Sequence, residues 1–114
     1  MGGSNTPYQT EIKLSTETQT VQNVREIIDI EPPKDFKVIY LNDDVTTFEF
    51  VIDSLVNVFT YTELDAEDKA FEISEKGSSV VAVLPFEIAE QKGVEVLVSA
   101  RNQGFPLEVK LETS

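Results

Sequence analysis

The most concentrated polar group in the sequence is the run Asn42-Asp43-Asp44, an amide beside two carboxylates. It follows a β-rich apolar segment, residues 36–41, and precedes a predicted helix start at Thr46, so it should lie in a connecting loop. Carboxylates in such a loop stabilise the positive end of the helix dipole, which is a purely structural role. A calcium loop of the EF-hand type does not fit, because counting from Asp43 neither position six is Gly nor position twelve is Glu. The residues alone leave the structural role open beside a binding role.

The composition argues against catalysis. The 114 residues include no His and no Cys, which removes the commonest general base, the commonest metal ligand and every thiolate. Ser and Thr are plentiful, but no imidazole can activate them, and Lys92 has no evident Ser partner. A hydrolase with paired carboxylates remains a remote alternative, since a chain of this length rarely builds the cleft that such an enzyme needs. We expect no catalytic residue, no metal ion and no cofactor.

The charge balance narrows the range of partners. Acidic residues number 21 against 9 basic ones, giving a formal net charge of −12. Nucleic acids and anionic membranes require a basic surface, so neither is an expected partner, whereas a positively charged group such as an N-terminal ammonium is. No apolar run approaches the length of a membrane span, and residues 1–4 lack the features of a signal peptide and resemble a cloning remnant. We therefore expect a cytoplasmic protein.

The chain divides into two regions near Pro32-Pro33. Residues 1–33 are rich in Thr, Gln, Asn and Glu, and such a composition predicts a mobile N-terminal extension. Val21, Val24, Ile27 and Ile28 have helical spacing within it, which fits either a transient turn or a segment that docks on a partner. Neither Pro has an N–H and each restricts its predecessor, so the folded domain should cover residues 34–114.

The first half of this domain should contain one strand and two helices. The strand covers residues 36–41, and a helix begins at Thr46, which forms a capping-box pattern with Glu49. A second helix is expected over residues 65–76 and should end at Gly77. The residues predicted to face inward on the two helices are Phe48, Val51, Ile52, Leu55, Val58 and Phe59, then Ala66, Ala70, Phe71 and Ile73.

The second half should add two strands and one helix. Residues 79–84 form a nearly continuous apolar run, which predicts a buried strand. A helix follows over residues 86–102, where Gly93 suggests close packing. Its predicted inner face comprises Ile88, Ala89, Val96 and Ala100. Alternating residues 107–112 predict a half-exposed strand. The expected fold is α+β: a single small domain of order β-α-α-β-α-β, whose three-stranded sheet carries three helices on one face.

Several separated motifs, in register over residues 32–112, resemble those of the ClpS family of Clp protease adaptors. They are Pro32-Pro33, the strand ending in Asn42-Asp43-Asp44, Thr46 with Glu49-Phe50-Val51, Gly77, Ala89-Glu90 with Lys92, Ala100-Arg101 and Pro106-Leu107. The resemblance implies a monomeric adaptor that binds the first residue of a substrate protein, preferably Phe, Tyr, Trp or Leu. It would deliver that protein to a ClpA- or ClpC-type unfoldase, and residues 1–33 would match the family's N-terminal extension.

The resemblance also implies roles for individual residues. Asn42, Asp43 and the position of Ser74 would bind the α-amino group. The side-chain pocket would be formed by Thr46, Phe48, Val51, Ala70, Ile73 and Leu107, although Val51, Ile73 and Leu107 can equally be core residues. Glu87 and Lys92 would contact the unfoldase, and their alternative is an ordinary solvated helix face.

Three of these positions depart from the family pattern. Ser74 stands where the family has His, Phe48 replaces a gating Met, and Ala70 replaces a larger apolar residue. Together they imply altered affinity or specificity. Ser74 also motivates an alternative function: a ClpS-like modulator that docks on the unfoldase without holding an N-terminal residue.

Overall fold

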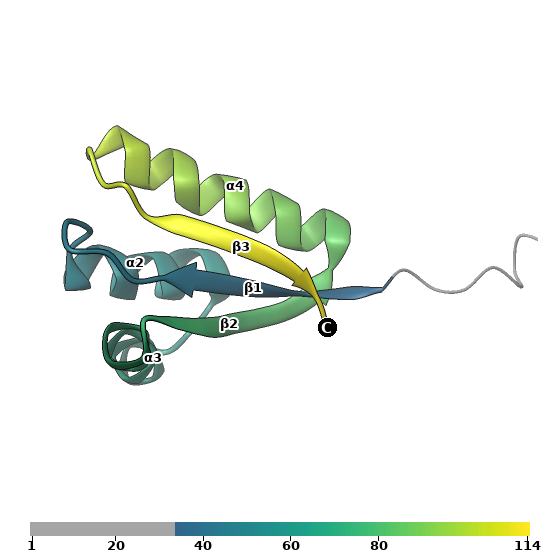
Figure 1. The fold of residues 1–114 in the computed structure, drawn as a ribbon, viewed down its shortest axis with the longest axis horizontal. Helices are drawn as coiled ribbons and strands as arrows, with labels where there is room; N and C mark the ends of the chain where they lie inside the picture. Colours follow the sequence, from purple (N-terminus) through teal and green to yellow (C-terminus); the bar gives the residue numbers. More distant parts are fainter. Residues whose placement is uncertain (1–33) are drawn as a thin grey trace, which may run out of the picture. The chain divides into compact units, whose positions relative to one another are not determined.

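The computed structural model describes residues 34–114, and the predicted extension 1–33 lies outside them. Three strands and three helices follow one another in the predicted order β-α-α-β-α-β (Figure 1). They are β1 (Asp35–Leu41), α2 (Phe48–Phe59), α3 (Glu63–Lys76), β2 (Ser78–Pro85), α4 (Phe86–Asn102) and β3 (Glu108–Thr113). None of these helices is long and apolar enough to cross a membrane.

The three strands form one antiparallel sheet in the order β2-β1-β3. The central strand β1 pairs along its length with both neighbours, so its end at Leu41 lies beside the start of β2 and the start of β3. A bulge interrupts the pairing with β2, because Val38 faces Ala82 while Ile39 faces Val80, which leaves Val81 without a partner on β1.

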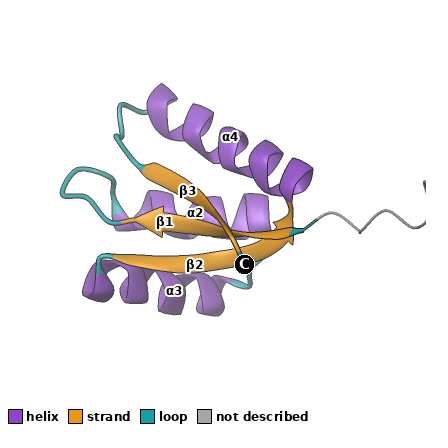
Figure 2. Ribbon diagram, turned by 45° about the vertical axis from the view of Figure 1, so that its right-hand side comes forward, coloured by secondary structure: helices purple, strands orange, loops and turns teal. Residues whose placement is uncertain are grey.

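All three helices cover the same face of the sheet, as predicted (Figure 2). Val38 and Tyr40 of β1 point to this face and are fully buried. The prediction of a buried second strand is wrong for Val80 and Val83, which are 37% and 50% exposed. The helices cover only one face of the sheet, and the bulge at Val81 turns both Val80 and Val83 to the uncovered face.

Two threonines set the helix starts. Thr47 is the N-cap of α2, because its hydroxyl accepts the Phe50 N–H at 3.1 Å, and the predicted capping box from Thr46 to Glu49 is therefore wrong. Thr62 caps α3 in the same way through the Asp65 N–H at 3.1 Å, so α3 begins earlier than the predicted residue 65. Gly77 ends α3 in the left-handed conformation, with φ of 88°, as predicted.

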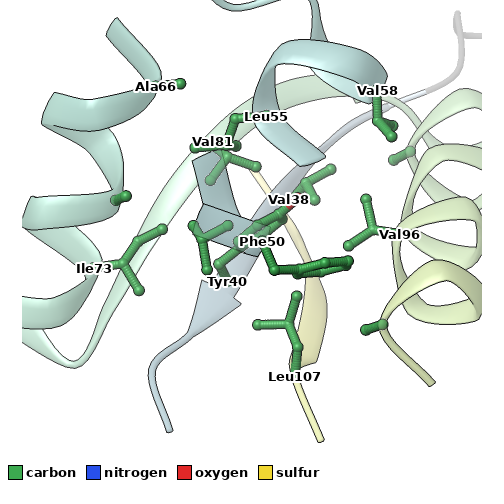
Figure 3. Close-up of a cluster of buried hydrophobic side chains, with 14 residues drawn as sticks. Val38, Tyr40, Phe50, Leu55, Val58, Ala66, Ile73, Val81, Val96 and Leu107 are labelled. Atoms are coloured by element: carbon green, nitrogen blue, oxygen red, sulfur yellow. The ribbon is translucent and has the colours of Figure 1, made fainter. Parts of the chain in front are cut away.

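The core lies between the sheet and the helices (Figure 3). Its largest fully buried side chains are Tyr40, Leu55, Leu107, Val38 and Val96. Phe71 is 60% exposed, and Phe48 and Ile88 are also exposed, so the prediction that these three face inward is wrong. Phe48 is the first residue of α2, where the chain leaves the loop. Phe71 and Ile88 each lie one residue from a buried Ala, and one residue turns a helical side chain by about 100°, which carries it off the core face.

Gly93 lies on the buried face of α4 beside β3. A methyl group at this position would meet Val109 Cγ1 at 3.8 Å, which is ordinary van der Waals contact. The helix therefore packs on the strand here without the very close approach that the sequence suggested.

Candidate functional site

The loop between β1 and α2 is organised around the Asp43 carboxylate. Oδ1 accepts the backbone N–H groups of Val45 at 2.8 Å and Thr46 at 2.6 Å, and Oδ2 accepts the Thr46 hydroxyl at 2.7 Å. The loop is also joined to the end of α3, because the Asn42 N–H donates to the Gly77 carbonyl at 2.8 Å. Asn42 and Asp43 are therefore held in place by backbone contacts at the edge of the sheet.

The Asp43 carboxyl is ionised at neutral pH. Partial burial opposes its ionisation, but the hydrogen bonds from Thr46 and Val45 and the positive charge of Arg101 hold its pKa below the usual range. A carboxylate offers about four acceptor positions, of which the loop uses three. Asp43 thus combines a fixed negative charge with remaining capacity to accept a hydrogen bond from a cation.

A hollow of about 290 Å³ opens beside this loop, where β1 ends and β3 begins. It is lined by Leu41, Asn42, Asp43, Pro106 and Glu108. The hollow combines two carboxylates, one amide and an apolar floor, so its chemistry suits a small cationic group attached to an apolar body.

The predicted pocket walls occupy two different environments. Val51, Ala70, Ile73 and Leu107 all belong to the buried hydrophobic core of the domain. Figure 3 shows Ile73 on α3 and Leu107 just before β3. Phe48 is 46% exposed at the start of α2, and Thr46 is half-buried in the loop. Ser74 follows Ile73 on α3 and is exposed. The four apolar walls are therefore core residues, the alternative that the sequence left open for Val51, Ile73 and Leu107, while Phe48 and Ser74 lie at the surface.

A larger cavity of about 490 Å³ lies between α2 and α4 and was not anticipated from the sequence. Glu49, Asp53, Asn57, Glu95 and Ser99 are among its polar lining residues. Ser54 lies at its buried side, but its hydroxyl is already hydrogen-bonded to Tyr40 Oη at 2.8 Å and to the Val51 carbonyl at 2.8 Å. The cavity contains none of the predicted site residues.

The two residues predicted to contact an unfoldase differ in their surroundings. Glu87 is exposed in the first turn of α4. Lys92 is half-buried, and its ammonium donates to the Val58 carbonyl at 2.9 Å and lies 6.0 Å from the centroid of the Phe59 ring. Lys92 therefore joins α4 to the last turn of α2, where a positive charge is favoured by the helix dipole.

Sequence reasoning gave no role to Arg101 beyond a family motif. In the structure its Nη1 donates to the carbonyls of Phe105 at 3.0 Å and Leu107 at 2.8 Å. A basic residue in the last helical turn can bind carbonyls at the helix end, but both acceptors of Arg101 lie beyond the end of α4 at Asn102, so the sequence did not indicate them.

Metal binding finds no support in residues 34–114, where no three carboxylates are grouped so that they could hold an ion. Asp43 instead uses its oxygens within its own loop.

Comparisons with known proteins agree on one family. The family model described as "ATP-dependent Clp protease adaptor protein ClpS" matches residues 31–110. The ClpS adapter protein of Clostridium acetobutylicum is 38% identical over 98 residues, which cover 86% of this chain and 97% of that protein. The corresponding protein of Nautilia profundicola is 41% identical over 95 residues, covering 83% of this chain and 96% of its own length.

A solved structure extends the likeness to three dimensions. It is that of Agrobacterium tumefaciens ClpS2 bound to L-phenylalaninamide, which is 37% identical and has a TM-score of 0.71. The likeness covers 73% of this chain and all of that one. The chain therefore belongs to the ClpS family of ATP-dependent Clp protease adaptor proteins.

Proposed function

We propose that this protein binds the free N-terminal residue of a substrate protein and delivers that protein to a Clp unfoldase-protease, without catalysing a reaction itself. The observation that carries the proposal is the fixed, ionised Asp43 carboxylate, which lines a hollow together with the apolar residues Leu41 and Pro106. An N-terminal residue has the same two parts, an ammonium and a side chain. L-Phenylalaninamide, the molecule bound to the related ClpS2, has both as well.

The α-ammonium would bind at Asn42 and Asp43, with Ser74 as a third contact. A hydrogen bond between an ammonium and a carboxylate is charge-assisted and stronger than a neutral one. Because the loop already holds Asp43 through three hydrogen bonds, little side-chain entropy would be lost on binding.

The first side chain would insert among Thr46, Phe48, Val51, Ala70, Ile73 and Leu107. Phe48 is exposed at the edge of this set, so its ring is placed to act as a movable cover. Ala70 removes side-chain volume from the α3 wall, which favours bulky hydrophobic first residues such as Phe, Tyr, Trp and Leu.

Docking on a ClpA- or ClpC-type unfoldase would use the α4 side of the domain, in the cytoplasm and as a monomer. The exposed Glu87 is available for a direct contact. The Lys92 ammonium donates a hydrogen bond to the Val58 carbonyl. Lys92 would therefore support docking in part by holding α4 against α2.

A second candidate function is favoured by Ser74, which is shorter than the His of the family pattern. A hydroxyl at this point gives the ammonium a weaker partner, and the loss of one hydrogen bond to a charged group costs about 1.5–3 kcal/mol. The protein would then dock on the unfoldase and modulate it without holding an N-terminal residue.

A panel of fluorescent peptides that differ only in residue one separates the two candidates. The adaptor function predicts selective binding to free N-termini and no binding after N-acetylation, because acetylation removes the positive charge. Replacement of Asp43 by Asn should weaken binding about tenfold or more, while Asp44→Asn serves as the matched control in the same loop. Absence of binding to every free peptide would support the modulator instead.

A further inference from the structure

Arg101 joins the end of α4 to the segment that leads into β3. A single guanidinium nitrogen, Nη1, donates to the carbonyl of Phe105 at 3.0 Å and to that of Leu107 at 2.8 Å. Both acceptors lie between the helix and the strand, so their positions depend on contacts of this kind rather than on a helix or sheet ladder.

The same segment has further anchors at its helical end. The Phe105 N–H donates to the Ala100 carbonyl at 2.9 Å, and its ring packs edge-on against Phe50 with centroids 5.3 Å apart. Gly104 makes the reversal possible, with φ of 79°. Beyond Phe105, the chain passes Pro106, which lines the hollow, and Leu107, which is buried in the core. The hydrogen bond from Arg101 to the Leu107 carbonyl therefore fixes the chain at the point where Pro106 lines the hollow and Leu107 enters the core.

The Asp43 loop lines the hollow together with Pro106 and Glu108 of the segment that Arg101 holds. The charge of Arg101 also reaches the Asp43 carboxyl. This charge is one of the influences that lower the pKa of the Asp43 carboxyl, after the hydrogen bonds from Thr46 and Val45. Asp44 follows Asp43 in the loop and Glu108 lines the same hollow, so the positive charge of Arg101 acts on an acidic part of the surface.

We propose that Arg101 is a positioning residue for N-terminal recognition, which holds the segment carrying Pro106 and Leu107 in place opposite the Asp43 loop across the hollow. This inference rests on the proposed adaptor function. Arg101 need not touch the bound residue: its side chain is committed to the Phe105 and Leu107 carbonyls. It would instead fix the distance between the ammonium site and the apolar wall.

The test compares Arg101→Gln, Arg101→Lys and the control Lys110→Gln. Lys110 is an exposed cation of β3 that is paired with Glu112 at 3.5 Å, so its replacement removes the same charge without altering the loop. Three quantities are measured for each protein: the affinity for a Phe-initiated peptide between pH 4 and 8, the pKa of the Asp43 carboxyl by carbon NMR without peptide, and the melting temperature.

For Arg101→Gln we expect about tenfold weaker binding, the scale of one lost hydrogen bond to a charged group. The Asp43 pKa should rise, and the acid limit of binding should move to higher pH with it. Arg101→Lys keeps the charge but lacks the rigid planar group, so it should retain the wild-type Asp43 pKa and recover only part of the affinity. Lys110→Gln should change neither.

Unchanged affinity in Arg101→Gln would overturn the inference. So would weaker binding with an unaltered Asp43 pKa and a melting temperature lowered in proportion, because that pattern indicates general destabilisation. If the wild-type protein binds no free N-terminus, the proposed function fails and this inference falls with it. If the wild-type protein binds the free peptide and Arg101→Gln binds it equally well, the role of Arg101 is rejected while the proposed function stands.

Discussion

Ser74 is the proposed ammonium contact at which this sequence departs from the family pattern. It lies exposed on α3, directly after the buried Ile73. Its hydroxyl can accept a hydrogen bond from an ammonium but reaches less far than an imidazole ring. The domain fold does not depend on this side chain, so its replacement reports on binding and not on stability.

Replacement of Ser74 by His should strengthen binding of Phe- or Leu-initiated peptides. The gain should be about tenfold at pH 8, where the imidazole is neutral and can accept a hydrogen bond from the ammonium. Fluorescence anisotropy measures it, with Ser74→Ala and an N-acetylated peptide as controls. Weaker binding by the His variant would mean that the pocket is arranged around the Ser side chain.

Several partners of individual residues could not be predicted from the sequence. The Asn-Asp-Asp run identified the loop at the end of β1, but Thr46, which was predicted to begin the first helix, belongs to this loop and binds Asp43. The partners of Lys92 and Arg101 were not predicted, because each donates to a backbone carbonyl whose position depends on tertiary packing. Val58 is 34 residues from Lys92, and no local pattern links them.

At the scale of elements, α4 is held against α2 partly by Lys92. Its ammonium binds the Val58 carbonyl near the negative end of the α2 dipole. The buried residues of α4 are mostly small, namely Ala89, Gly93, Val96 and Ala100. Their apolar contacts alone therefore do not account for how α4 packs, and the Lys92 hydrogen bond adds to them.

Replacement of Lys92 by Met should lower the free energy of unfolding by about 1–2 kcal/mol, because the buried carbonyl loses a charged donor while the apolar stem is kept. Urea denaturation measures the change. Lys76→Met is the matched control, since its 3.9 Å ion pair with Glu72 is exposed and contributes little. Equal stability of Lys92→Met and wild type would leave unfoldase contact as the sole role of Lys92.

The elements themselves were largely predictable, because their apolar residues recur with the period of a strand or a helix. The errors arose where two local signals competed. Thr46 and Thr47 are adjacent hydroxyls, and only the recruitment of Thr46 by Asp43 decides that Thr47 caps α2. The run 79–84 is apolar on both faces, so its sequence could not reveal that Val80 and Val83 face solvent.

At the scale of the whole molecule, stability should depend on pH at both extremes. Asp43 and Glu72 have pKa values below the usual range: burial opposes ionisation of Asp43 but its loop hydrogen bonds outweigh it, and a hydrogen bond from Ser79 acts on Glu72. Burial raises the pKa of Tyr40. A carboxyl group whose pKa is lower in the folded state stabilises the fold at pH values above its unfolded pKa. This stabilisation is lost as the pH falls through the folded pKa. A Tyr hydroxyl whose pKa is higher in the folded state stabilises the fold at pH values below its unfolded pKa. This stabilisation is lost as the pH rises toward the folded pKa.

Unfolding free energy should therefore be highest between about pH 5 and 9 and decline below about pH 4 and above about pH 10. Urea titrations across this range measure it. Asp43→Asn should flatten the acid decline, and Tyr40→Phe should flatten the alkaline one. An acid decline that is the same in Asp43→Asn and wild type would contradict the role given to the Asp43 hydrogen bonds.

A ¹H–¹⁵N NMR titration with L-phenylalaninamide and with its N-acetylated form tests whether the domain recognises a free N-terminal residue. The free amine should shift the amide signals of residues 42–46, 70–74 and 107, and the acetylated compound should not. Shifts confined to the cavity between α2 and α4, at Glu95 and Ser99, or shifts of equal size with both compounds, would contradict this expectation.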